Sequence, residues 1–163
     1  MKKNEKGKRK MSTISVKEDM TMKLKVIGYW ATTAVVALEL LAGGVTDLIH
    51  GPALLFAGDP VVPVLAQLGY PVYLLTILGV WKLLGAIVLL IPRFPRLKEW
   101  AYAGTFFVYM GATASWAARG GGMGNLIAPL ILAVLTLASW ALRPPGRTLG
   151  LLLPGRRTCV GPS

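Results

Sequence analysis

The sequence predicts an all-α integral membrane protein, a four-helix bundle with both termini in the cytoplasm. Of its 163 residues, 54% are hydrophobic and only 15% are charged, whereas a soluble domain carries roughly a quarter of charged residues. The net charge of +11 would by itself indicate nucleic-acid binding. However, nine of the 18 basic residues lie in the first 25 positions, and between residues 26 and 92 the only Lys or Arg is Lys82. The charge therefore belongs to tails and loops, and the expected partner is the lipid bilayer, not nucleic acid.

Four apolar stretches have about the length of a bilayer crossing, which takes roughly 20 residues. A segment that crosses must be helical, because lipid offers no partners to backbone N–H and C=O groups. Pro129 is expected in the first turn of the last helix, where a missing N–H does least harm. The predicted spans are residues 26–49, 71–91, 99–118 and 125–142.

Basic residues in the connecting segments predict the orientation of these spans. They precede the first span, occupy the link between the second and third, and follow the fourth, whereas the loop at 51–70 contains no Lys or Arg. Positive residues stay on the cytoplasmic side, so a multi-pass protein of the cell membrane with cytoplasmic termini is expected. Trp30, Trp100 and Trp140 near the inner ends and Trp116 near the outer end fit an aromatic belt.

The segments outside the membrane domain, which we place at residues 23–143, differ in composition from it. Residues 1–22 are rich in Lys and have little to bury, so we expect a disordered basic tail. Residues 144–163 are rich in Pro, Gly and Arg and are expected to be irregular. In the first loop, the apolar residues 53–57 and 61–68 are too short to cross and predict interfacial or re-entrant segments.

Two ionisable residues lie deep inside the apolar spans, at a cost of roughly 2.5–3.5 kcal/mol each, and are functional candidates. Glu39 lies ~15 Å from the outer end of the first span and Lys82 ~16 Å from that of the second, at 1.5 Å per residue. An intramembrane Glu39–Lys82 pair of opposite charge would remove most of this cost. Either a structural clasp that fixes helix register or a proton-relay or ligand-docking site explains such a pair. Glycines at positions 43, 44, 79 and 85 would let the helices approach closely.

Further polar residues accompany this pair. Asp47 and His50 continue a sparse polar track toward the outer face, although a solvated helix end is the commoner explanation of residues near the interface. Hydroxyls in the third span are most simply explained by hydrogen bonds between helices; they belong to Thr105, Tyr109, Thr113 and Ser115.

Motifs of enzymes that act alone are absent from the sequence. A single Cys, Cys159, and a single His exclude an intramolecular disulfide, a CxxC centre and a His/Cys metal site. The sequence contains no nucleophile elbow, P-loop or HExxH motif. No metal site and no independent catalytic centre are therefore predicted.

The stretch LGYPVYLLTILGVWKLLGAIVLLIPRFPRLKEWAYAG, at 68–104, resembles the signature core of the DoxX-like family of small membrane proteins. The segments ALELLAGG and ASWALRPPGR resemble it too, and the similarity covers about residues 23–147. The resemblance implies a four-helix membrane bundle. It also implies signature positions at Gly69, Tyr70, Pro71, Trp81, Lys82, Arg96, Lys98, Glu99 and Tyr102. Relatives often have Ser-His at the end of the third helix, whereas here Trp116 follows Ser115.

The founding member of the family resembles a small subunit of an archaeal complex that oxidises thiosulfate and passes electrons to a quinone. The first hypothesis is therefore an accessory subunit of a quinone-linked redox system, with quinone as cofactor and another membrane or redox protein as partner. A non-catalytic scaffold that docks another membrane protein is the alternative. A small proton-coupled transporter ranks third, because no inverted repeat is evident and four helices leave little room for a pathway unless chains associate into an oligomer.

Overall fold

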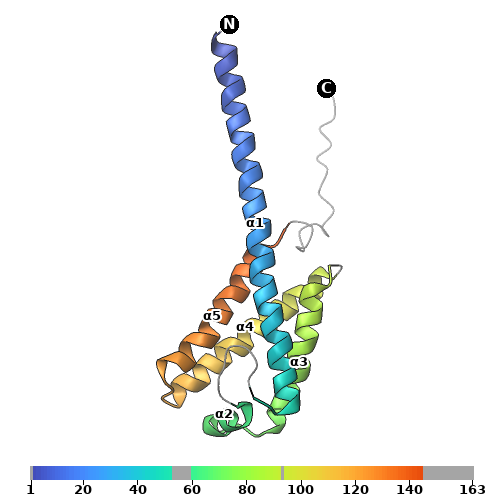
Figure 1. Ribbon diagram of the computed structural model, residues 1–163, viewed down its shortest axis with the longest axis vertical. Coiled ribbons are helices and arrows are strands. Elements are labelled where there is room, and N and C mark those ends of the chain that lie inside the picture. The colour runs from blue at the N-terminus through green and yellow to red at the C-terminus, as the bar shows by residue number, and fades with distance from the viewer. Residues whose placement is uncertain (1, 53–59, 93, 145–163) are drawn as a thin grey trace, which may run out of the picture.

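The computed structural model describes residues 2–52, 60–92 and 94–144, with side chains from residue 17 onward. Five helices and no strands occur in these ranges (Figure 1), which confirms the all-α prediction. The helices are α1 (Lys2–Ile49), α2 (Val61–Leu68), α3 (Tyr73–Leu90), α4 (Pro95–Ala118) and α5 (Met123–Ala141). The apolar residues 53–57 and all but the first residue of the expected irregular tail lie outside the described part.

The four long helices pack side by side in two antiparallel pairs, α1 with α3 and α4 with α5, and further contacts join α1 to α5 and α3 to α4. We call the end where the N-terminal part of α1 leaves the packed helices the terminal end, and the opposite end the α2 end. In Figure 1, α3 and α4 meet near the terminal end and diverge toward the other, where α2 lies. The packing is therefore closed at one end and wider at the other.

Within the described residues, three helical segments are long and apolar enough to cross a membrane, at 17–49, 73–90 and 123–141. The fourth expected span, 99–118, lies within α4, whose 24 residues give ~36 Å at 1.5 Å per residue. Its apolar content is diluted by Tyr, Thr, Ser and Gly residues. Pro129 lies at the seventh position of α5 and not in its first turn, because α5 begins at Met123. Its ring removes the N–H that would bond the carbonyl of Asn125.

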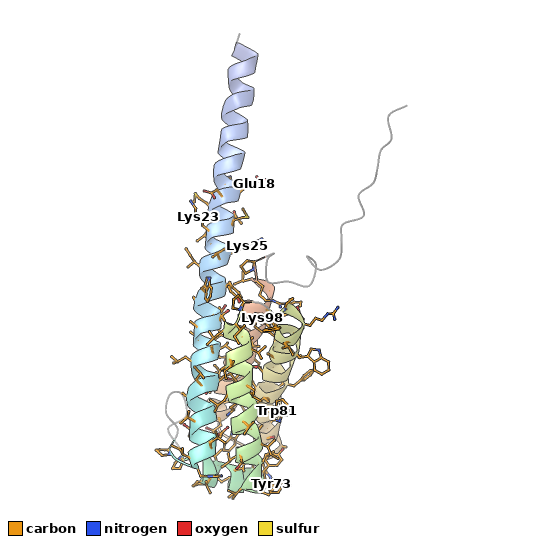
Figure 2. All side chains as sticks on the ribbon, turned by 90° about the vertical axis from the view of Figure 1, so that its right-hand side faces the viewer. Glu18, Lys23, Lys25, Tyr73, Trp81 and Lys98 are labelled. Atoms are coloured by element: carbon orange, nitrogen blue, oxygen red, sulfur yellow. The ribbon has the colours of Figure 1, made fainter. Side chains whose placement is uncertain are left out.

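The N-terminal residues that we expected to be disordered form the first part of α1 (Figure 2). Residues 17–27 are exposed, and the ion pair between Lys23 and Asp19, at 2.9 Å, is exposed too. Burial therefore does not hold this part in a helix. A helix that is already formed can be extended without a new nucleus, so the buried part of α1 provides the start that an isolated segment lacks.

The short helix α2 corresponds to the segment at 61–68 that was expected to lie at the interface. It ends at Gly69, whose φ of 80° is in the left-handed region that favours glycine. Two contacts from α4 hold its end: Arg119 Nε donates to the Leu68 carbonyl at 3.2 Å, and the Tyr70 and Ser115 hydroxyls lie 2.9 Å apart. The segment therefore rests on the long helices.

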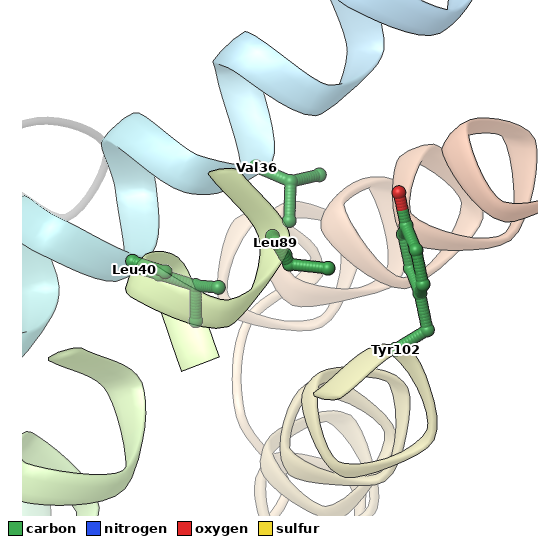
Figure 3. Packing of buried hydrophobic residues seen from close by; sticks show 5 residues of the cluster. Val36, Leu40, Leu89 and Tyr102 are labelled. Atoms are coloured by element: carbon green, nitrogen blue, oxygen red, sulfur yellow. The ribbon is translucent and has the colours of Figure 1, made fainter. Parts of the chain in front are cut away.

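The main buried cluster lies nearer the terminal end and joins α1, α3 and α4 (Figure 3). It consists of Val36, Leu40, Ala86, Leu89 and Tyr102, each at most 3% exposed. In the other half of the contact between α1 and α3, Gly44 and Gly79 face each other. A Cβ built on Gly79 would lie 2.9 Å from the Gly44 carbonyl oxygen, so the two backbones approach as closely as the sequence predicts.

Replacing Gly79 with alanine should lower the free energy of unfolding by about 1–3 kcal/mol, the usual cost of overpacking. Gly104→Ala in α4 is the matched control, because a Cβ there meets nothing within 4 Å. It should raise stability by up to about 1 kcal/mol, since alanine favours the helix. Denaturant unfolding in detergent, followed by circular dichroism, measures both; equal effects would contradict the close approach.

Candidate functional site

A cavity of about 720 Å³ lies between the long helices at the α2 end. All five helices contribute to it, and four apolar residues of α2 close part of its wide end. Its floor is polar and consists of Glu39, Asp47, Lys82 and Tyr109. Its walls are largely apolar and include Leu74, Leu75, Leu78, Phe107, Val108, Trp116 and Leu132.

An ion pair between Lys82 and Asp47 forms the centre of the floor. Lys82 Nζ donates to Asp47 Oδ2 at 2.6 Å, and the two side chains are 19% and 4% exposed. The structure thus pairs Lys82 with Asp47 and not with Glu39. Side chains lean toward the N-terminus of their helix, so Lys82 on α3 reaches toward the α2 end while α1 side chains lean the other way. Lys82 therefore meets the α1 residue nearer that end.

Glu39 lies beside this ion pair. A Cβ on Gly43 would lie 3.4 Å from Lys82 Nζ and 3.6 Å from Glu39 Oε1, which places both groups around one glycine. Glu39 Oε2 is buried without a hydrogen-bond partner among the described residues, and so is Tyr109 Oη from α4. An unsatisfied buried polar group costs about 1–3 kcal/mol, so these two atoms mark a place prepared for a polar partner.

Asp47 and His50, expected as one polar track, have different surroundings. Asp47 is 3% exposed and belongs to the floor, so it is not a solvated helix end. His50 is exposed and has a φ of 51° directly after α1. It is not among the residues that line the cavity. The hydroxyl of Tyr109 contributes to the cavity floor, although the sequence favoured interhelical bonding.

A sequence profile described as the DoxX-like family matches residues 24–139. The chain belongs to the DoxX-like family. No match was found among curated proteins or among solved structures. Together with its apolar helices of membrane length, this membership makes the chain an integral membrane protein, and it confirms the resemblance read from the sequence. In the part of the chain that the structure describes, no cluster of three His, Cys, Asp or Glu residues suits a metal ion.

The DoxX-like signature positions fall in different parts of the structure. Gly69, Tyr70 and Pro71 form the turn between α2 and α3, where Tyr70 also lines the cavity. Trp81 and Arg96 are exposed and point to no site. The remaining positions are Lys82 in the floor and Lys98, Glu99 and Tyr102 at the terminal end.

Lys98, Glu99 and Tyr102 join the helices at the terminal end. Lys98 lies near the start of α4, at the terminal end (Figure 2). It is fully buried, and its Nζ donates to the carbonyl oxygens of Val88, at 3.1 Å, and Leu89. These are among the last carbonyls of α3, which have no partner within their own helix. A basic side chain that reaches the end of a helix satisfies them, so Lys98 fastens α4 to α3.

The other two residues fasten α4 to α5. Glu99 accepts hydrogen bonds from Arg143 Nη2 and Trp140 Nε1, both at 2.7 Å. The Tyr102 hydroxyl lies 2.9 Å from that of Ser139, which in turn lies 2.6 Å from the hydroxyl of Thr33 on α1. We call the bonds made by Lys98, Glu99 and Tyr102 the terminal network. From the sequence, Arg143 was expected only to orient the protein in the membrane, and Ser139 was not singled out. Their spacing of four residues, which places both on one side of a helix, was the available signal.

A double-mutant cycle tests the pairing in the floor. Lys82→Met should destabilise the fold by about 3–5 kcal/mol, because it leaves Asp47 as an unpaired buried charge. The coupling free energy of Lys82→Met with Asp47→Asn should lie at about 0.5–3 kcal/mol and exceed that with Glu39→Gln. Unfolding of the single and double variants in detergent measures both couplings; stronger coupling to Glu39 would contradict the assigned pair.

Proposed function

We propose that the protein is a small membrane subunit of a quinone-linked redox system and that its cavity binds the quinone head group. The observation that carries this proposal is an apolar cavity with two unpartnered buried polar atoms, Glu39 Oε2 and Tyr109 Oη, at its polar floor. Ligand sites of small molecules are typically concave, mostly apolar and supplied with a few convergent polar groups. Membership of the DoxX-like family supports it as well.

The floor fits the chemistry of a quinone. Its ring oxygens accept hydrogen bonds, and the Tyr109 hydroxyl is a donor without a partner among the described residues. Lys82 Nζ has three donors, of which one is used on Asp47. Glu39 accepts a hydrogen bond when ionised and donates one when protonated, so it suits the reduced form as well. A bound quinone supplies two-electron chemistry, and the electrons come from a redox protein associated with this subunit.

The arrangement in the membrane is part of this proposal. We place α1, α3, α4 and α5 across the bilayer as a four-helix bundle, because α4 packs along both α3 and α5. Basic residues gather at the terminal end, among them Lys25, Lys98 and Arg143, whereas Arg119 is at the α2 end. Positive residues favour the cytoplasm. We therefore place both termini on the cytoplasmic side of the cell membrane and the cavity in the outer half of the bilayer.

A non-catalytic scaffold is the second candidate. The observation that favours it is the Lys82–Asp47 bond, which satisfies the lysine within the chain and fixes α1 against α3. The Asp47→Lys, Lys82→Asp exchange separates the two candidates. A scaffold whose charges only lock the fold keeps partner binding after this exchange, whereas a quinone site loses affinity because the donor has moved.

Tyr109→Phe should weaken quinone binding by roughly twofold to twelvefold, the equivalent of one hydrogen bond of about 0.5–1.5 kcal/mol. Stability should not fall, because the lost hydroxyl has no partner in the described structure. Titration of the purified protein with menadione, followed by fluorescence quenching, measures the affinity.

The matched control for this variant is Tyr73→Phe, which changes an exposed tyrosine outside the cavity. It should leave the affinity unchanged. Purified protein that carries no quinone and fails to bind added menadione would exclude the proposed function.

Cys159, the single cysteine, reports the topology. A membrane-impermeant maleimide should label it only after the cells are permeabilised, because the C-terminus is placed in the cytoplasm. In a Cys159→Ser background, Gly122→Cys in the turn before α5 should be labelled in intact cells. The reverse pattern would invert the proposed orientation.

A further inference from the structure

The cavity has an opening between α3 and α4. Leu74 and Leu78 of α3 line it opposite Val108 and Gly111 of α4. None of these four is fully buried, and Gly111 is exposed. Phe107 also lines the cavity although it is 68% exposed. Residues that belong both to the wall of a cavity and to the surface of the molecule mark its opening, so we call this side the α3–α4 cleft.

The α3–α4 cleft exists because the two helices are joined only toward one end. Near the terminal end, Lys98 bonds the last carbonyls of α3, and a Cβ on Gly85 would lie 3.9 Å from the Thr105 hydroxyl. Toward the α2 end the helices diverge (Figure 1). A Cβ on Gly111 would meet nothing within 4 Å, so no side chain of α3 fills the space beside it.

The surface around the α3–α4 cleft is apolar. Ile77 on α3 and Phe107 on α4 are both exposed. Gly111 is seven residues from the end of α4 at Ala118, or ~10 Å at 1.5 Å per residue. This depth lies within the hydrocarbon part of a bilayer, whose core is about 30 Å thick. The opening therefore faces lipid chains and not water.

Part of the α2 end of the cavity is covered by α2. Its residues Val61, Val64, Leu65 and Leu68 face the cavity, and Arg119 holds its last carbonyl. The turn that follows is fixed by the bond between the Tyr70 and Ser115 hydroxyls. A ligand dissolved in the membrane can therefore reach the floor sideways, without passing α2.

We propose that the α3–α4 cleft binds the hydrocarbon tail of a membrane-borne ligand whose uncharged polar head occupies the cavity floor. This inference rests on the proposed function and names the ligand class and its route. The head contacts Glu39 and Tyr109, and the tail passes Gly111 into the surrounding lipid. A long isoprenoid or similar chain then needs no room inside the protein, because only its first units lie between the helices.

The floor supports an uncharged head group. It presents the carboxyl groups of Glu39 and Asp47 against the single ammonium of Lys82, and that ammonium is bonded to Asp47. No surplus positive charge therefore faces the cavity to hold a phosphate or carboxylate. The buried polar atoms of the floor without a partner among the described residues are one carboxyl oxygen and one hydroxyl, which suit ring oxygens or ring hydroxyls.

Gly111→Leu, assayed in lipid nanodiscs, tests the cleft with two quinones that share a head group: menaquinone, which has an isoprenoid tail, and menadione, which has none. The Cβ position of Gly111 is open, so a leucine there can extend into the cleft. We expect roughly tenfold weaker menaquinone binding, because the leucine side chain occupies the path of the tail and overpacking costs about 1.4 kcal/mol. Menadione binding should stay within about twofold of the wild type.

Gly104→Leu is the matched control. Gly104 is one heptad from Gly111 on α4, is exposed, has an equally open Cβ position and does not line the cavity. It should leave the affinity for both quinones unchanged. Retained menadione binding also shows that each variant is folded.

The outcomes separate this inference from the proposed function. If the wild type binds both quinones and Gly111→Leu weakens neither, or weakens both equally, the tail does not use the α3–α4 cleft and the inference is overturned. If the wild type binds neither quinone, the proposed function fails with it. Selective loss of menaquinone binding supports both.

Discussion

Lys98 is fully buried, and its ammonium group bonds the last carbonyls of α3. The last carbonyls of a helix have no donor within that helix, so this bond fixes the start of α4 against the end of α3. Glu99 and Tyr102 continue the terminal network to α5 and, through Ser139, to α1. All four long helices are thus joined at the terminal end.

The cavity is the consequence of that one-sided fastening. Toward the α2 end, α1 and α3 stay together because Gly44 and Gly79 allow backbone contact and because the Lys82–Asp47 ion pair lies between them. At the α2 end, no comparable contact joins α3 to α4 among the described residues. The cavity beside them has the polar floor and the largely apolar walls described above. A rigid, closed end and an open, partly polar end therefore coexist in one small protein.

The apolar runs predicted α1, α3 and α5 because length and hydropathy are properties of each segment alone. They also pointed to Glu39 and Lys82, since charge inside an apolar run is visible without a structure. The similar depth of Glu39 and Lys82 did not predict the partner of Lys82. Side chains point toward the N-terminus of their own helix, and in antiparallel helices this brings Lys82 to Asp47. The cavity was not predictable either, since it depends on helix angles set by contacts such as that of Lys98. Residues 2–22 are helical because they continue the helix that the buried part of α1 has started. The composition of residues 2–22 alone does not predict this.

The two carboxyl groups of the floor have a consequence for competition. A cavity that opens sideways into a bilayer is surrounded by phospholipids, which vastly outnumber any redox carrier. Their anionic phosphates find no uncompensated cation in the floor, since Lys82 is already bonded to Asp47. An abundant lipid can insert an acyl chain but gains no anchor for its head, whereas a scarce neutral molecule gains hydrogen bonds. The arrangement thus favours occupancy by the rarer species.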